Sequence, residues 1–75
     1  MKALLEYIVR NLVDTPEAVR IKERSGRFTV TYHLSVAPSE TGKVIGRNGR
    51  VAKAIRDLMG VAAARKKKRV HVDIE

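Results

Sequence analysis

The sequence predicts an α+β fold with the element order αββααβ. Three features support it: a helical pattern over residues 1–13, a period-two pattern on both sides of Ser25-Gly26, and a helix–turn–helix pattern before a last alternating strand. A strand, two helices and a strand form a crossover, and a crossover usually places its two strands parallel in one sheet. We therefore expect a three-stranded mixed sheet with three helices packed on one face.

The first helix is predicted from apolar residues that recur at the spacing of one helical face. They are Leu4, Leu5, Ile8, Val9, Leu12 and Val13. The helix should end near Asp14-Thr15-Pro16, because proline disfavours helical backbone in the residue before it and cannot donate to the hydrogen-bond ladder.

Two strands are expected next, because the hydrophobic period changes to two. Residues 19–24 alternate around Val19 and Ile21. The inward residues of the second strand are predicted to be Phe28, Val30, Tyr32, Leu34 and Val36. A tight turn at Ser25-Gly26 would join the two strands into a hairpin, and Pro38 would end the second strand.

A short helix over residues 40–45 and a longer helix complete the crossover before the last strand. Ser39 suits the N-cap of the short helix, and Gly46 suits a left-handed C-cap. The apolar face of the longer helix comprises Val51, Ala54, Ile55, Leu58, Met59 and Ala62, and its opposite, basic face comprises Arg50, Lys53 and Arg56. Residues 65–69 are expected to form an exposed loop, and residues 70–74 the last strand.

The composition predicts one domain of a cytoplasmic protein. At 75 residues the chain is near the smallest size that one hydrophobic core can hold folded, so a single domain over residues 1–75 is expected. The chain has no cysteine, which excludes thiol chemistry and is typical of a reducing compartment. Its apolar runs are too short to span a bilayer, so no membrane partner is predicted.

The positive charge is concentrated in one segment. The formal net charge is +8 at pH 7, and such a field usually meets nucleic acid or an acidic membrane surface. Residues 42–69 contain ten basic residues and one acidic residue, which gives this segment +9 and the rest of the chain −1. The basic residues are Lys43, Arg47, Arg50, Lys53, Arg56, Arg65, Lys66, Lys67, Lys68 and Arg69. This segment is therefore the predicted binding surface.

A Gly-x-x-Gly turn, Gly46-Arg47-Asn48-Gly49, lies in this segment between two predicted helices. Glycine permits a positive φ in such a tight turn and lets another backbone approach closely. The N–H groups and the dipole at the start of the following helix favour anions, and Arg47 and Arg50 add positive charge. The turn is therefore predicted to hold a nucleic-acid strand by its phosphates.

The segment Ile45-Gly46-Arg47-Asn48-Gly49-Arg50, in this strand–helix–turn–helix–strand frame, resembles the signature of KH domains. The order αββααβ is similar to that of a type II KH domain, with residues 28–75 as the core unit and residues 1–27 as the added helix and strand. The chain is similar to the KhpA family of small bacterial proteins. The resemblance implies a non-catalytic protein that binds single-stranded RNA, as an RNA chaperone or post-transcriptional regulator. It also implies a homodimer, or a heterodimer with a KhpB-like partner.

The same resemblance implies which residues contact RNA. Residues 46–49 would hold the backbone of about four nucleotides. Val44, Ile45 and Val51 would line an apolar floor for the bases, and residues 65–69 would supply a second rim. The full set is Lys43, Val44, Ile45, Gly46, Arg47, Asn48, Gly49, Arg50, Val51, Lys53, Arg65, Lys66, Lys67 and Lys68.

Each of these assignments has a purely structural alternative. Gly46 and Gly49 also suit an ordinary helix cap and turn. Residues 65–69 also suit a solvated loop, and the three apolar residues of the floor also suit the core. Because aromatic residues make up only 4% of the chain, binding is not expected to depend on an aromatic stacking platform.

Other functions fit the sequence less well. A P-loop needs Ser or Thr after Gly-Lys, but Val44 follows Gly42-Lys43, so no enzyme, cofactor or small-molecule substrate is predicted. His33 and His71 lack the carboxylate or thiolate neighbours of a metal site, so no metal is predicted. The main alternative is a protein-interaction or ribosome-associated module with secondary RNA contact. Double-stranded DNA binding is a weaker alternative, because no base-reading helix stands out.

Overall fold

The chain forms its helices and strands in the predicted order. The computed structural model describes all residues from Met1 to Glu75. Its elements are α1 (Lys2–Arg10), β1 (Arg20–Ser25), β2 (Thr29–Ser35), α2 (Thr41–Ile45), α3 (Arg50–Arg65) and β3 (Arg69–Ile74). Single turns of 3₁₀ helix lie at Pro16–Ala18, Pro38–Glu40 and Arg47–Gly49. The predicted order αββααβ is confirmed.

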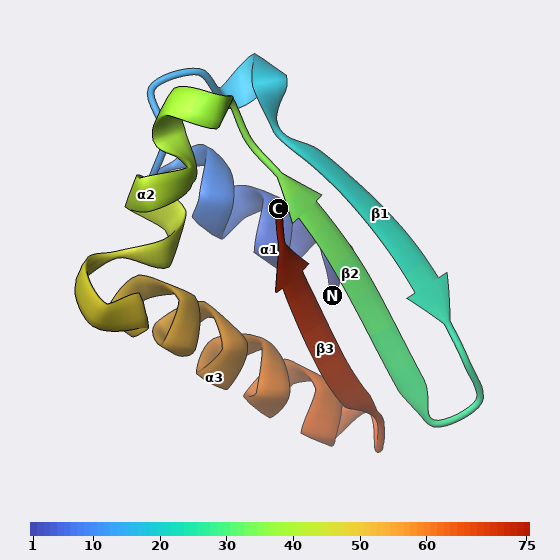
Figure 1. Ribbon diagram of the computed structural model, residues 1–75. Coiled ribbons are helices and arrows are strands. Elements are labelled where there is room, and N and C mark those ends of the chain that lie inside the picture. Colours follow the sequence, from blue (N-terminus) through green and yellow to red (C-terminus); the bar gives the residue numbers. More distant parts are fainter.

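The three strands form one mixed sheet in the order β1-β2-β3. β1 and β2 are antiparallel, with Arg20 opposite Ser35, and β2 and β3 are parallel, with Thr29 opposite Arg69. A parallel pair is the expected result of a crossover through two helices. Because the three helices cover one face of the sheet (Figure 1), the predicted two-layer α+β architecture is confirmed.

The core lies between the sheet and the helices. Strand β2 alternates buried with partly exposed residues, because successive side chains of a strand point to opposite faces. Its inward residues Val30, Tyr32 and Leu34 belong to a cluster of 12 buried residues that also includes Met59 of α3. Burial and the neighbouring Glu23 raise the pKa of Tyr32 to about 12, so its hydroxyl stays neutral at physiological pH.

The other face of the sheet is polar. Thr31, His33 and Ser35 of β2 lie there and are partly exposed, and His33 Nδ1 lies 3.5 Å from Asp73 Oδ2 of β3. No three His, Cys, Asp or Glu side chains lie close enough together to hold a metal ion. This face is the solvated side of a sheet that helices cover on one side only.

The first helix ends earlier than the sequence predicted. α1 stops at Arg10, because Nδ2 of Asn11 donates a hydrogen bond of 2.7 Å to the backbone oxygen of Tyr7. A side chain that bonds to the backbone in this way competes with the next turn of helix. Val13 is buried although it lies beyond the helix. The apolar pattern therefore predicted a core residue correctly, but the predicted end of the helix near Asp14 is wrong.

The turn between β1 and β2 lies later than predicted. β1 includes Ser25, and a hydrogen bond of 2.6 Å from Gly26 N–H to Thr29 C=O closes the hairpin around Arg27 and Phe28. The prediction that Phe28 is the first inward residue of the second strand is therefore wrong. Phe28 lies in the turn, and 69% of its surface is exposed.

The start of the short helix also differs from the prediction. Pro38–Glu40 forms a 3₁₀ turn, and the α-helical residues begin at Thr41. Ser39 is exposed and makes no capping hydrogen bond, so its predicted role as N-cap is wrong. Glu40, in contrast, is buried, with 5% of its surface exposed.

The buried face of α3 is rotated from the predicted one. Its buried residues are Ala52, Ile55, Met59 and Ala63. Ala54 and Leu58 were predicted on the inner face, but both are exposed, and Leu58 has 54% of its surface exposed. Because the helix is rich in alanine, its apolar residues are compatible with more than one buried face. The buried face combines Ile55 and Met59, which have 2% and 0% of their surface exposed, with two alanines.

Candidate nucleic-acid interface

The Gly-x-x-Gly turn has a backbone conformation that depends on its glycines. Gly46 has φ 76° and ψ 173°, a region that essentially only glycine occupies. Asn48, with φ 56°, and Gly49, with φ 73°, are left-handed. The prediction of a left-handed cap at Gly46 is therefore wrong, because its ψ of 173° lies outside the left-handed helical region. Its φ is positive as predicted, but its backbone is extended and leads the chain away from α2 into the turn.

Close packing gives the two glycines different roles. A Cβ added to Gly46 would lie 2.9 Å from the backbone nitrogen of Val51, and closer still to the side chain of that residue. A Cβ added to Gly49 would meet nothing within 4 Å. Gly46 therefore allows the turn to lie against the first residues of α3, whereas Gly49 is needed only for its positive φ.

The start of α3 is open to an anion. Gly49 is the N-cap residue, and no side chain caps the first turn of this 16-residue helix. Uncapped N–H groups and the helix dipole favour negative charge at such an end. Arg47, Asn48 and Arg50 are exposed here, and neither arginine forms an ion pair. The turn thus combines backbone donors with uncompensated positive charge.

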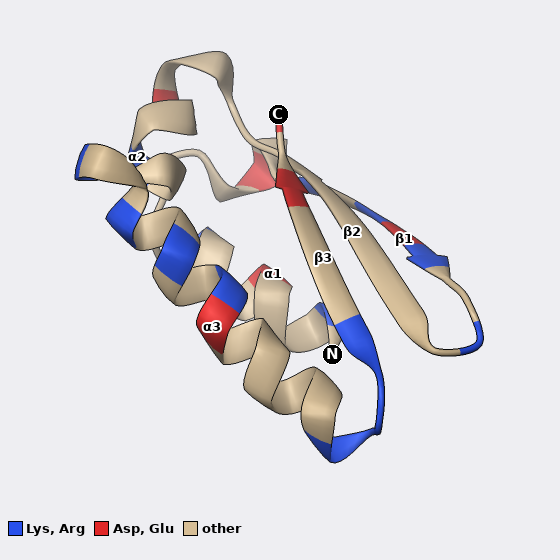
Figure 2. Ribbon diagram, turned by 60° about the horizontal axis from the view of Figure 1, so that its bottom comes forward, with Lys and Arg blue, Asp and Glu red and all other residues tan.

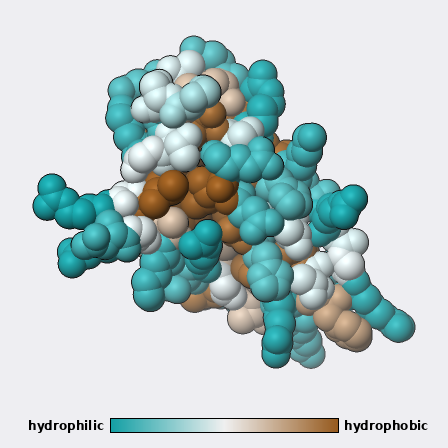
Figure 3. Space-filling model, in the orientation of Figure 1, coloured by the Kyte–Doolittle hydropathy of each residue, from teal (hydrophilic) through white to brown (hydrophobic).

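An apolar surface lies near the turn, between α2, α3 and β3 (Figure 3). Ile45 of α2 is exposed, and Val51 of α3 is partly exposed. Val44 has 0% of its surface exposed, so it supports this surface from beneath and presents no atom to a ligand. Of the three residues predicted as a floor, Val44 therefore belongs to the core.

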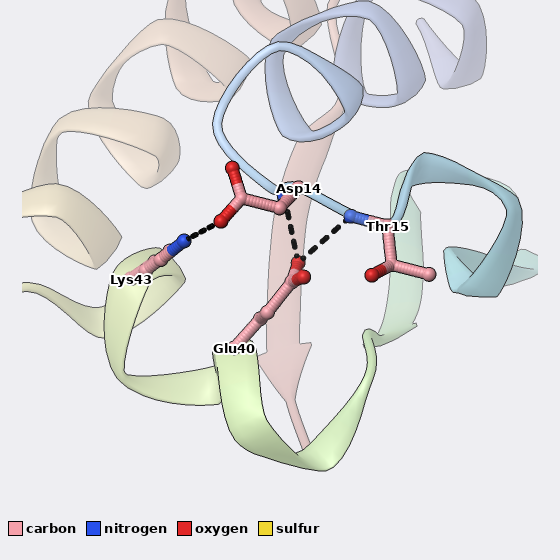
Figure 4. A network of polar contacts seen from close by, with 4 residues as sticks. All are labelled: Asp14, Thr15, Glu40 and Lys43. Atoms are coloured by element: carbon pink, nitrogen blue, oxygen red, sulfur yellow. Dashed lines mark hydrogen bonds and ion pairs between the residues drawn. The ribbon is translucent and has the colours of Figure 1, made fainter.

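Lys43 is held by an acidic side chain. Its Nζ donates to Asp14 Oδ2 in the segment after α1, as Figure 4 shows, and this hydrogen bond raises the pKa of Lys43. Beside this pair, Oε2 of the buried Glu40 accepts hydrogen bonds from the N–H groups of Asp14 (3.0 Å) and Thr15 (3.3 Å). The network ties the segment after α1 to the start of α2. It also reduces the positive charge that Lys43 presents to a ligand.

The basic residues of α3 differ in whether another group of the protein interacts with their charge. Lys53 Nζ pairs with Asp57 Oδ2 at 3.0 Å, one helical turn further on. Arg56 Nε donates a hydrogen bond of 3.2 Å to the backbone oxygen of Val72 in β3. Arg50 forms neither kind of contact. Its charge is therefore the least compensated on this side of the helix.

The predicted basic loop is a short, ordered turn. Arg65 ends α3 and Arg69 begins β3, so only Lys66–Lys68 connects them. The N–H groups of this turn bond to the last carbonyls of α3 in a Schellman motif, with Lys67 at φ 57°. The length of α3 separates it from the Gly-x-x-Gly turn by about 24 Å. The predicted site residues thus form two clusters, and Lys and Arg mark both in Figure 2.

Two features of the structure, the burial of Glu40 and the place of Phe28 in the hairpin turn, were not predicted from the sequence. Glu40 was predicted only as a first-turn acid, because its backbone partners lie 26 and 25 residues away and no local pattern links them. Phe28 was predicted as a strand residue, because the alternation of β2 continues through it. The two-residue spacing between Gly26 and Thr29 is the one local feature that favours a turn at Arg27-Phe28.

The remaining surface has no enclosed site. The molecule contains no pocket. None of its helices combines the length and the apolar character needed to cross a bilayer.

A family model described as KhpA/KhpB, KH domain, matches residues 2–74. The RNA-binding protein KhpA of Chlamydia pneumoniae is 53% identical over 74 residues, which cover 99% of this chain and 95% of that protein. Proteins of the same name from Clostridium acetobutylicum and Caldanaerobacter subterraneus subsp. tengcongensis are 49% and 47% identical over 74 residues. In each case these residues cover 99% of this chain and 99% of the relative. No solved structure matches this chain. The chain therefore belongs to the KhpA/KhpB family of KH-domain proteins.

Proposed function

We propose that this protein binds single-stranded RNA without catalysis and holds the RNA backbone with its Gly-x-x-Gly turn. The main support is the uncapped start of α3, where Arg47 and Arg50 carry positive charge that no acidic side chain offsets. The relatives described above are named RNA-binding proteins. In this proposal a phosphate lies against the first N–H groups of α3, and bases rest on the apolar surface that includes Ile45 and Val51.

The proposed role is that of a cytoplasmic RNA chaperone or post-transcriptional regulator. Contacts to phosphates do not depend on base sequence, so a protein that binds mainly through them serves many RNAs. Such binding weakens steeply with salt, with a log–log slope of about −0.7 for each contact on a single strand. The net charge of +8 on 75 residues favours this mode.

The double substitution Arg47→Asp with Asn48→Asp is expected to weaken binding of a labelled single-stranded RNA about tenfold or more, which corresponds to about 1.4 kcal/mol. Two carboxylates in the turn repel the phosphate that the start of α3 would bind. The fold should survive, because both side chains are exposed and aspartate tolerates the left-handed conformation of Asn48. Fluorescence anisotropy at several salt concentrations measures both the affinity and the salt slope.

The matched control is Lys2→Asp with Ala3→Asp. It makes the same change in net charge at two exposed, adjacent positions in the first turn of α1. The proposal requires a larger loss of affinity, and a shallower salt slope, in the turn variant than in this control. Equal effects in two folded variants would show that only the overall charge matters. The turn would then have only a structural role, and the hypothesis of a protein-interaction module would be favoured.

The proposal also includes a dimer, either of two copies or with a KhpB-like partner. α3 exposes Ala54, Leu58 and Val61, and the last two have 54% and 59% of their surface exposed. Their spacing of four and three residues places them on one side of the helix, away from the side on which Arg56 contacts β3. A domain this small gains stability when a partner covers such an apolar strip.

Replacing this strip with polar residues, Leu58→Gln with Val61→Gln, is expected to shift the protein to the monomer. Glutamine keeps helix propensity and adds no charge, so RNA binding by the monomer should change little. Sedimentation at rising protein concentration measures the mass of both forms. A wild-type chain that remains monomeric up to high micromolar concentration would contradict the homodimer.

A further inference from the structure

The hairpin turn between β1 and β2 exposes an aromatic ring at the edge of the molecule. Arg27 and Phe28 form the tip of this turn, which the hydrogen bond from Gly26 to Thr29 closes. Phe28 has 69% of its surface exposed, and the hairpin tip extends away from the helices (Figure 1). In Figure 3 an apolar surface stands at this end of the molecule among hydrophilic side chains. The ring contributes nothing to the core, and the Gly-x-x-Gly turn does not use it.

One cation lies against the ring, and a second basic segment begins beside the hairpin. The Arg27 guanidinium lies 5.8 Å from the centre of the Phe28 ring, within the range of a cation–π contact. A hydrogen bond of 2.8 Å from Arg69 N–H to the Phe28 backbone oxygen brings the basic turn Lys66–Lys68 next to the hairpin. Figure 2 shows Lys and Arg in both turns.

None of these cations forms an ion pair. The three ion pairs of the molecule involve His33, Lys43 and Lys53, which lie elsewhere. The uncompensated residues at this end are Arg24, Arg27, Lys66, Lys67, Lys68 and Arg69. We call these six residues, together with Phe28, the hairpin-end patch.

We infer that the hairpin-end patch is a second contact for single-stranded RNA, in which a base stacks on Phe28 and the cations of the patch hold the adjacent phosphates. Stacking on an aromatic side chain accepts any base, because every base has a π-face. The cations would also attract an acidic peptide, but acidic side chains have no flat ring that could stack on Phe28. The combination of one ring and many unpaired cations therefore favours a nucleic-acid strand.

The position of the patch predicts a dependence on RNA length. The inference rests on the proposed function, in which the Gly-x-x-Gly turn holds about four nucleotides. The patch lies beyond the other end of α3, about 24 Å from that turn. A strand of about four nucleotides is too short to reach Phe28 while the turn holds it. A strand about three times as long spans both clusters and gains the second contact.

The test compares Phe28→Ala with the wild type on two oligouridine RNAs, one of about four nucleotides and one about three times as long. The variant is expected to bind the long RNA about fivefold or more weakly, because stacking is lost. Its affinity for the short RNA should equal that of the wild type. Tyr7→Ala is the matched control, because Tyr7 is the other highly exposed aromatic residue and lies on α1.

A second variant reports the contact directly. The chain contains no tryptophan, so the tryptophan fluorescence of Phe28→Trp, excited selectively over the two tyrosines, comes from this one position. Quenching by the long RNA, without quenching by the short RNA or by oligoglutamate, is the expected result. Quenching by oligoglutamate alone would overturn the inference in favour of an acidic protein partner.

The outcomes also separate this inference from the proposed function. If Phe28→Ala binds the long RNA as the wild type does, the second contact is wrong, while the turn can still be tested with Arg47→Asp and Asn48→Asp. If Phe28→Ala weakens both RNAs equally, the ring is not a separate contact, and the inference is overturned. If the wild type binds neither RNA, the proposed function fails, and the inference fails with it.

Discussion

Gly46→Ala is expected to destabilise the protein by about 3 kcal/mol or more. A methyl group at this position meets the backbone nitrogen of Val51 at 2.9 Å, and a backbone atom at the start of a helix has little freedom to move away. Overpacking of this kind costs about 1–3 kcal/mol. The backbone of Gly46, with φ 76° and ψ 173°, adds about 1–3 kcal/mol for any other residue. A domain of 75 residues has a total stability of about 4–11 kcal/mol, so the loss is a large fraction.

Gly49→Ala is the matched control for this prediction. Gly49 also has a positive φ, but its Cβ would enter open space, so the cost should be limited to about 1–2 kcal/mol of backbone strain. Urea unfolding measures both variants under one set of conditions. Equal midpoints for the two variants would show that the contact between Gly46 and Val51 is not a constraint on the turn.

The fold was predictable because hydrophobic periodicity determines which elements form. The helical spacing before Asp14, the alternation of β2 and the glycine turn between two helices were sufficient for the order αββααβ and for the parallel pair. The element ends were not predictable from periodicity. A side-chain hydrogen bond from Asn11 ends α1, and the hydrogen bond from Gly26 to Thr29 sets the hairpin turn. Both depend on local geometry that the apolar pattern does not contain.

The candidate site was predictable only in part. Glycine spacing and local charge placed the turn and its arginines, because those requirements are local in sequence. The pairing of Lys43 with Asp14 spans 29 residues and depends on how the segment after α1 returns to α2. The separation of residues 65–68 from the turn likewise follows from the length and direction of α3. Linear charge density therefore suggested one continuous surface where the fold forms two clusters.

Glu40→Ala is expected to lower the free energy of unfolding by about 2–4 kcal/mol, although Glu40 is a charged residue outside the hydrophobic core. Its carboxylate accepts hydrogen bonds from the backbone N–H groups of Asp14 and Thr15, as Figure 4 shows. Removal of the acceptor leaves these part-buried donors without a protein partner, and a hydrogen bond to a charged group contributes about 1.5–3 kcal/mol. Burial of the side chain, with 5% of its surface exposed, limits how well water can replace it.

Glu40→Gln separates the loss of the acceptor from the loss of the charge. Its amide oxygen has the same position and still accepts hydrogen bonds, so only the charge-assisted part of the interaction is lost, about 1 kcal/mol. Urea unfolding should therefore rank the wild type above Glu40→Gln, and Glu40→Gln above Glu40→Ala. Because Glu40 joins the segment after α1 to the start of α2, the alanine variant should also show faster amide exchange at Asp14 and Thr15. Identical stability of the two variants would mean that the charge of Glu40, rather than its hydrogen bonds to the backbone, holds these segments together.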